Sequence, residues 1–172
     1  MQSWFSHLFS LTTLWVLGSP FPVWANAEYI GLNEVPEHLT FQGGWVIRDS
    51  PYIVDIVVDA ECRSRPCAPG QAQMLWLEET LELDEHGVAH FEVVDVIELQ
   101  DGYEVGFAKQ LFRYCAVEGE LDLDVFAIAQ FEPEQEVLTT IHQAWRVNRD
   151  AGAFEIIQTT KVSCFNPLPG GH

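Results

Sequence analysis

From Thr40 to Cys164 the chain is a succession of segments rich in β-branched and aromatic residues. Short polar links with Gly or Pro separate almost all of them, and only Glu61–Ala72 is long enough to be a substantial loop. The links between the later segments are "DEHG", "QDG", "EGE", "EPEQ" and "RDAG". Links this short join neighbouring strands as antiparallel hairpins. The expected strands are Phe41–Arg48, Tyr52–Ala60, Gln73–Leu83, Val88–Leu99, Tyr103–Val117, Leu121–Phe131, Val137–Asn148 and Ala153–Cys164.

Strands joined in this way predict an all-β fold, an antiparallel meander of about eight strands. Such a chain either curls into an up-and-down barrel or folds as a two-layer β-sandwich. We favour the barrel, because a sandwich needs longer crossings between its layers. We expect one β-rich domain over residues 28–165, followed by a flexible C-terminal tail over residues 166–172.

The first residues have the composition of a secretory signal peptide. Residues 1–27 contain no Asp, Glu, Lys or Arg, carry an apolar run over Leu8–Leu17, and end in the small-residue pattern Ala25-Asn26-Ala27. This pattern predicts cleavage after Ala27 and an exported chain, in a periplasm, a lumen or the extracellular space. The alternative is an uncleaved membrane anchor, although the apolar run is shorter than the ~20 residues that a membrane-spanning helix needs.

The chain is strongly acidic. It has 26 Asp and Glu residues against 8 Lys and Arg, a formal net charge of -18, while 48% of its residues are apolar. The apolar content indicates a folded core rather than a disordered acidic chain. The charge repels phosphate backbones and acidic lipids, so we expect no nucleic-acid binding and no stable membrane anchor after signal cleavage. The expected partner is a small molecule or another protein.

Export changes what the cysteines indicate. Cys62, Cys67, Cys115 and Cys164 are an even number in a compartment that favours disulfides, and four cysteines allow three pairings. We favour Cys62 with Cys67, which closes a short turn. The remaining pair, Cys115 with Cys164, then closes a long loop between two expected strands.

The stretch "CRSRPC" at residues 62–67 has four residues between its cysteines, which is not the spacing of thioredoxin-type or zinc-finger motifs. A disulfide-closed turn is the favoured interpretation. The alternative is that Arg63 and Arg65, displayed on this turn, recognise a carboxylate or an acidic partner through their forked donors.

Lys109 and Arg113 share one face of the fifth expected strand with apolar residues. If "EGE" forms a three-residue loop, Val117 pairs with Leu121 and both cations point into the barrel, as a site for an anionic head group. If the loop holds two residues, Glu118 pairs with Leu121 and Arg113 points outward, beside acidic residues. Because a buried unpaired cation is costly, we favour the outward arrangement and keep the inward one as a hypothesis.

Enzyme motifs are absent from the sequence. There is no G-x-S-x-G, no H-E-x-x-H and no glycine-rich phosphate loop, and no cysteine is free to be a nucleophile if both disulfides form. We therefore lean towards a protein without catalytic residues, metal or cofactor. Asp122 and Asp124 of "DLD" leave weak divalent-cation binding open. Candidate metal ligands that nothing in the pattern brings together are His86, His90, Glu92 and His142.

The segment "GGWVIRDSPY" places Gly43 and Trp45 in the first expected strand. It is similar to the G-x-W signature that begins lipocalins, which are secreted eight-stranded barrels that bind small apolar molecules. The resemblance covers these ten residues, and the other lipocalin motifs are not matched. It implies a calycin-like barrel in which Trp45 closes the floor as a structural residue rather than a ligand contact.

Two functions are compatible with these patterns. The first is non-catalytic binding of a small apolar or amphiphilic ligand, with Lys109, Arg113, Phe107 and Trp145 as the candidate ligand-binding residues. The second is a structural or protein-interaction module of an extracytoplasmic assembly. An interior volume of ~300 Å3 or more favours the first function, and a fully packed interior favours the second.

Overall fold

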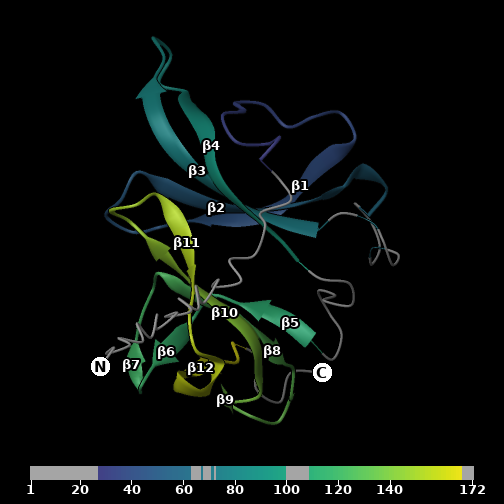
Figure 1. Ribbon diagram of the computed structural model, residues 1–172, viewed down its shortest axis with the longest axis vertical. Helices are drawn as coiled ribbons and strands as arrows, with labels where there is room; N and C mark the ends of the chain where they lie inside the picture. The colour runs from purple at the N-terminus through teal and green to yellow at the C-terminus, as the bar shows by residue number, and fades with distance from the viewer. Residues whose placement is uncertain (1–26, 63–66, 68–70, 72, 100–108, 168–172) are drawn as a thin grey trace, which may run out of the picture.

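The computed structural model describes residues 27–62, 67, 71, 73–99 and 109–167. These residues form antiparallel strands and two short 3-10 turns, η1 (Ala60–Cys62) and η2 (Thr159–Lys161). The all-β, antiparallel class expected from the sequence is confirmed. The strands are grouped in three sheets, and none of the sheets in the described part of the chain closes into a barrel (Figure 1).

Sheet A follows the expected hairpins. Its strands lie side by side in chain order. The β1–β2 and β3–β4 links, residues 47–51 and 84–88, are short hairpin connections, whereas the β2–β3 link is the longer segment of residues 60–72. Their bounds are close to the expected ranges: β1 (Leu39–Val46), β2 (Tyr52–Asp59), β3 (Gln73–Leu83) and β4 (Ala89–Glu98).

The second half of the chain alternates between two further sheets. Sheet B has the spatial order β11, β10, β8, β5, and sheet C has the order β7, β6, β12, β9. The strands of sheet B are β5 (Lys109–Phe112), β8 (Val125–Gln130), β10 (Ile141–Asn148) and β11 (Ala153–Ile156). Those of sheet C are β6 (Cys115–Val117), β7 (Glu120–Leu121), β9 (Val137–Leu138) and β12 (Val162–Phe165).

This alternation corrects four of the expected strands. Each of the segments beginning at residues 103, 121, 137 and 153 was expected to be one continuous strand, but each is divided between sheets B and C. At one of the breaks the Asp122 carboxylate accepts a hydrogen bond from the Asp124 amide at 3.0 Å. An aspartate side chain that accepts a hydrogen bond from the amide two residues later forms a turn, and the turn interrupts the hydrogen bonding between strands. Residues 103–108 of the first segment lie outside the described residues.

The "EGE" turn also differs from both expected registers. Val117 pairs with Glu120, so the two loop residues are Glu118 and Gly119. Both have positive φ, 53° and 89°, as a type I′ hairpin turn requires. The side chain of Lys161 holds this turn from η2, with Nζ 2.7 Å from Glu118 Oε1. Neither sequence-based register describes the observed hairpin, although Arg113 is exposed, as the favoured outward arrangement expects.

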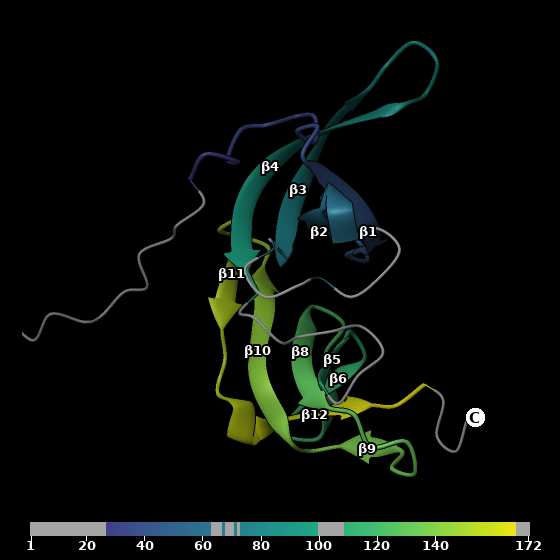
Figure 2. The ribbon, with the colours of Figure 1, turned by 90° about the vertical axis from the view of Figure 1, so that its right-hand side faces the viewer.

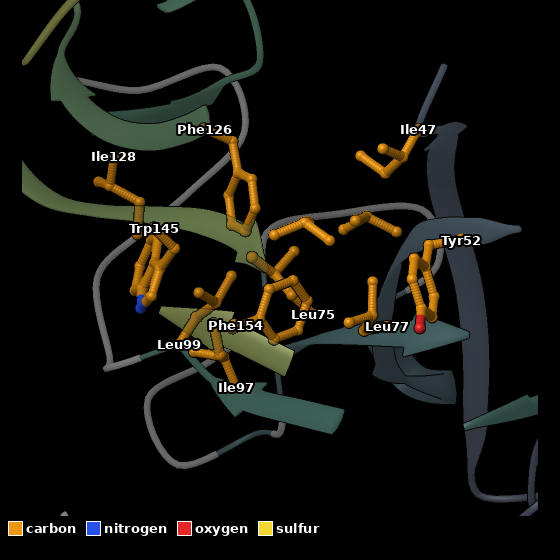
Figure 3. Packing of buried hydrophobic residues seen from close by; sticks show 12 residues of the cluster. Ile47, Tyr52, Leu75, Leu77, Ile97, Leu99, Phe126, Ile128, Trp145 and Phe154 are labelled. Carbon is orange, nitrogen blue, oxygen red and sulfur yellow. The ribbon is translucent and has the colours of Figure 1, made fainter. Parts of the chain in front are cut away.

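The core lies in layers between the sheets (Figures 2 and 3). Strand β8, sequence VFAIAQ, is buried on both faces, which explains its continuous apolar run. Its Phe126 and Ile128 pack towards sheet A, whereas Val125, Ala127 and Ala129 pack towards sheet C. The outer face of sheet A is covered by the N-terminal residues Tyr29, Leu32 and Val35.

Candidate functional site

A cleft of about 480 Å3 lies between sheets A and B, and residues of β1 and β5, an edge strand of each sheet, line it together with Phe165 of β12. The cleft continues the apolar core outward, because Trp45, Ile56 and Leu111 line it and also pack against the buried cluster between the two sheets. Its full lining is Gly44, Trp45, Ile56, Gln110, Leu111, Phe112, Arg113, Tyr114, Phe165 and Pro167.

Arg113 is the one Lys, Arg, Asp or Glu among the described residues that line the cleft. It lies at the break between β5 and β6, where the chain passes from sheet B to sheet C. The residue is exposed, and its guanidinium carbon lies 4.8 Å from the centre of the Tyr114 ring. This contact holds the charged group over an aromatic surface while its donors stay accessible to solvent.

The rim of the cleft is fixed by the second disulfide. Cys115 and Cys164 are bonded to each other across β6 and β12. Each lies next to an exposed aromatic residue of the rim, Tyr114 and Phe165, and the Phe165 amide donates a hydrogen bond to the Tyr114 carbonyl at 2.7 Å. The cross-link therefore holds two aromatic rim residues on adjacent segments of backbone.

The floor of the cleft meets an aromatic cluster. The Trp45 ring packs edge-on against Phe126, with 5.6 Å between ring centres. Phe126 in turn stacks on Trp145 at 5.7 Å and contacts Phe154 edge-on at 5.5 Å (Figure 3). Phe126, Trp145 and Phe154 are buried and Trp45 is half-buried against them, so the floor is rigid.

The described residues among the sequence-predicted ligand set lie in different surroundings. Arg113 lines the cleft, whereas Trp145 is 4% exposed and belongs to the core beneath it. Lys109 is half-buried at the start of β5, opposite Gln130, and does not line the cleft. Phe107 lies outside the described residues. The aromatic rim residues Tyr114 and Phe165 were missed, because the break that exposes Tyr114 falls within a segment that reads as one strand.

Both favoured disulfides are present, Cys62–Cys67 and Cys115–Cys164. Disulfides persist in oxidising compartments, so they indicate an exported environment. Arg63 and Arg65, between the first two cysteines, lie outside the described residues, as does Ala25 of the expected signal-cleavage pattern. Among the residues that the structure describes, no helix is long and apolar enough to cross a membrane.

Sheet A contains a pair of partly buried carboxyl groups that sequence reasoning did not identify. Asp55 of β2 and Glu78 of β3 share a side-chain hydrogen bond, and Glu78 is 6% exposed. Burial, with the charge and hydrogen bond of Asp55, raises the pKa of Glu78 to about 7. Burial also raises the pKa of Asp55, while the hydrogen bond from Glu78 opposes this rise. The shared proton therefore belongs to Glu78.

A third carboxylate joins the two sheets. Asp95 of β4 accepts a hydrogen bond from the Phe154 amide of β11, with Oδ2 to N at 2.7 Å. Its other oxygen accepts from the Val96 amide at 2.8 Å. Burial raises the pKa of Asp95, and the two backbone donors oppose this shift. Asp95 therefore positions β11 against β4 (Figure 1).

The other candidate groups are dispersed. Within the described ranges no three His, Cys, Asp or Glu residues come close enough to hold a metal ion. Asp122 and Asp124 instead bind arginines, with Asp122 Oδ2 2.8 Å from Arg146 and Asp124 Oδ1 2.7 Å from Arg149. His142 is half-buried, and burial, followed by the charge of Lys109, lowers its pKa. His86, His90 and Glu92 lie on the hairpin that β3 and β4 form.

Comparison with known proteins assigns no family to the chain. No protein-family model, no curated protein and no solved structure matches the chain significantly.

Proposed function

We propose that this exported protein binds a small amphiphilic molecule with an anionic head group, without catalysis, in the cleft between β1, β5 and β12. The observation that carries the proposal is the combination of volume and lining. The cleft measures about 480 Å3 and is lined mainly by aromatic and aliphatic side chains, with the Arg113 guanidinium at its exposed rim.

The volume suits a ligand of small-molecule size, since binding sites for such ligands span roughly 300–1,000 Å3. Burial of an apolar tail against Trp45, Ile56 and Phe112 supplies the hydrophobic gain. The planar guanidinium of Arg113 matches the geometry of a carboxylate, sulfate or phosphate. The proposal does not need the closed barrel expected from the sequence, because the cleft lies between two sheets and not inside one.

The first test is native mass spectrometry of the mature protein, purified from its own host. An added mass that is lost on collisional activation supports a bound ligand and gives its chemical class. The intact mass tests export as well, because removal of residues 1–27 leaves Glu28 at the N-terminus. A full-length chain would contradict the proposed signal cleavage at Ala27.

The second test compares dodecanoate with dodecanol by isothermal titration. The two probes share a tail and differ in the charge of the head group. We expect the unmodified protein to prefer dodecanoate about tenfold, and Arg113→Gln to remove that preference, since a hydrogen bond to a charged group contributes about 1.5–3 kcal/mol. Arg48→Gln is the matched control, because Arg48 is exposed and does not line the cleft. Equal affinity for both probes in the unmodified protein would refute the anionic head group.

A further inference from the structure

The hairpin formed by β3 and β4 extends beyond the rest of sheet A. Tyr52 is the first residue of β2 and pairs with Glu79, and the Thr80 amide donates a hydrogen bond to the Pro51 carbonyl at 2.8 Å. Beyond Thr80, β3 and β4 pair only with each other in the described structure. Figures 1 and 2 both show the hairpin projecting away from the body of the molecule. We call residues 80–91 the hairpin arm.

The tip of the hairpin arm is fixed by its own hydrogen bonds. The Asp84 carboxylate accepts from the backbone amides of His86 and Val88, each at 2.8 Å. The Asp84 amide also donates to the Val88 carbonyl at 2.9 Å, and Gly87 adopts the positive φ of 78° that closes the turn. A tip ordered in this way loses little conformational freedom on binding.

The hairpin arm exposes three large apolar side chains. Leu81, Leu83 and Val88 are 54%, 64% and 57% exposed. Leu83 pairs with Ala89, and Val88 lies opposite Asp84, so Leu83 and Val88 belong to opposite faces of the hairpin. Single exposed leucines are ordinary, but three large exposed aliphatic residues within residues 81–88 give the end of the hairpin an apolar tip. Such a tip fits a complementary apolar pocket on another molecule.

The charges of the hairpin arm favour a partner with a positively charged surface. The arm carries Glu82, Asp84 and Glu85 and has no Lys or Arg. At its base Glu79 and Glu92 lie directly opposite each other on paired strands. Like charges in this position destabilise the pairing of the strands. A second copy of this chain, with its own net charge of -18, would add to the repulsion. A cationic surface would relieve it.

We propose that the hairpin arm is a docking element for a basic protein, whose surface presents an apolar pocket bordered by Lys or Arg. The apolar tip supplies contact area, and the acidic residues beside it supply orientation and faster association. This surface is separate from the ligand cleft, whose lining includes no residue of the arm. The two proposals can therefore fail independently.

The test uses the mature, disulfide-bonded chain and two synthetic peptides as probes. One peptide alternates lysine with leucine, and the other alternates lysine with serine. Binding is followed by fluorescence anisotropy in about 150 mM salt, where long-range charge attraction is strongly screened. We expect the lysine–leucine peptide to bind at least tenfold more tightly than the lysine–serine peptide, and the double variant Leu81→Ser, Leu83→Ser to remove this difference.

Leu121→Ser is the matched control, because Leu121 is 58% exposed in the β6–β7 hairpin and also has a glutamate beside it. It is expected to bind both peptides like the unmodified protein. Hydrogen exchange in the complex should protect residues 80–91. Equal affinity of the unmodified protein for the two peptides would overturn the proposal, because the arm would then act only as an acidic surface. The same conclusion would follow if Leu121→Ser lost the preference for the lysine–leucine peptide as fully as the double variant does. Concentration-dependent dimerisation abolished by the double variant, or binding of the arm to zwitterionic lipid vesicles, would also overturn it in favour of another occupant.

Discussion

The carboxyl pair in sheet A makes folding stability depend on pH near neutrality. Glu78 is almost fully buried, and its pKa is about 7 against an ordinary value of 4.5. Between these two values the folded chain binds more protons than the unfolded chain does. The free energy of unfolding therefore falls as the pH rises through this range. Above pH 7 the fold has lost the stability that protonated Glu78 contributes at lower pH.

The size of the effect follows from the difference in pKa. A difference of one pKa unit corresponds to 1.36 kcal/mol, so ionised Glu78 destabilises the fold by about 3 kcal/mol above neutral pH. Glu78→Gln removes the ionisable group while its amide can still donate a hydrogen bond to Asp55. We expect the variant to match the unmodified protein at about pH 4 and to be more stable by up to about 3 kcal/mol at about pH 8.5.

The assay is urea unfolding of the oxidised protein, followed by tryptophan fluorescence at half-unit steps between about pH 4 and pH 9. Glu82→Gln serves as the matched control, because Glu82 is exposed on the same strand and lies outside the carboxyl pair. We expect this control to keep the pH dependence of the unmodified protein. If Glu78→Gln leaves that dependence unchanged, or lowers stability equally at both ends of the range, Glu78 is not protonated in the folded state and the reasoning is wrong.

Three further perturbations test other parts of the fold by the same unfolding assay. A Cβ at Gly44 would overlap the Asp55 side chain and the backbone of β2, so Gly44→Ala should cost about 1–3 kcal/mol, whereas Gly43→Ala, with open space around it, should be close to neutral; equal costs would contradict the clash. Replacing both cysteines of the Cys115–Cys164 disulfide with serine should cost about 2–5 kcal/mol, and unchanged stability would show that this cross-link constrains little. Asp95→Ala leaves the amide of β11 without its acceptor and should cost about 1–3 kcal/mol, with faster amide exchange in β11; unchanged exchange would exclude the proposed link between sheets.

The strands of sheet A could be predicted closely from local patterns. Each is a β-branched or aromatic run bounded by turn residues, and each pairs with the next strand in the chain. Such hairpins are local, so the periodicity that marks a strand also selects its partner. Both disulfides could also be predicted, because a short "CRSRPC" turn leaves one remaining pair.

The candidate site was only partly predictable, because it depends on contacts between segments that are far apart in the chain. The cleft depends on strand breaks such as that between Phe112 and Cys115, where the chain leaves sheet B for sheet C. Arg113 could be selected as an unusual cation in an apolar segment. The aromatic residues beside it, Tyr114 and Phe165, come from segments far apart in the chain, and no local pattern brings them together.

The sequence by itself determined the all-β class, the hairpins of the first sheet and the two disulfides, because these follow from residue types and short separations along the chain. Tertiary structure decided where the later segments break, which sheet each piece joins, and which carboxyl groups share a proton. The physical reason is that a strand with two apolar faces, such as β8, can be buried between two sheets only if the neighbouring segments divide themselves between them.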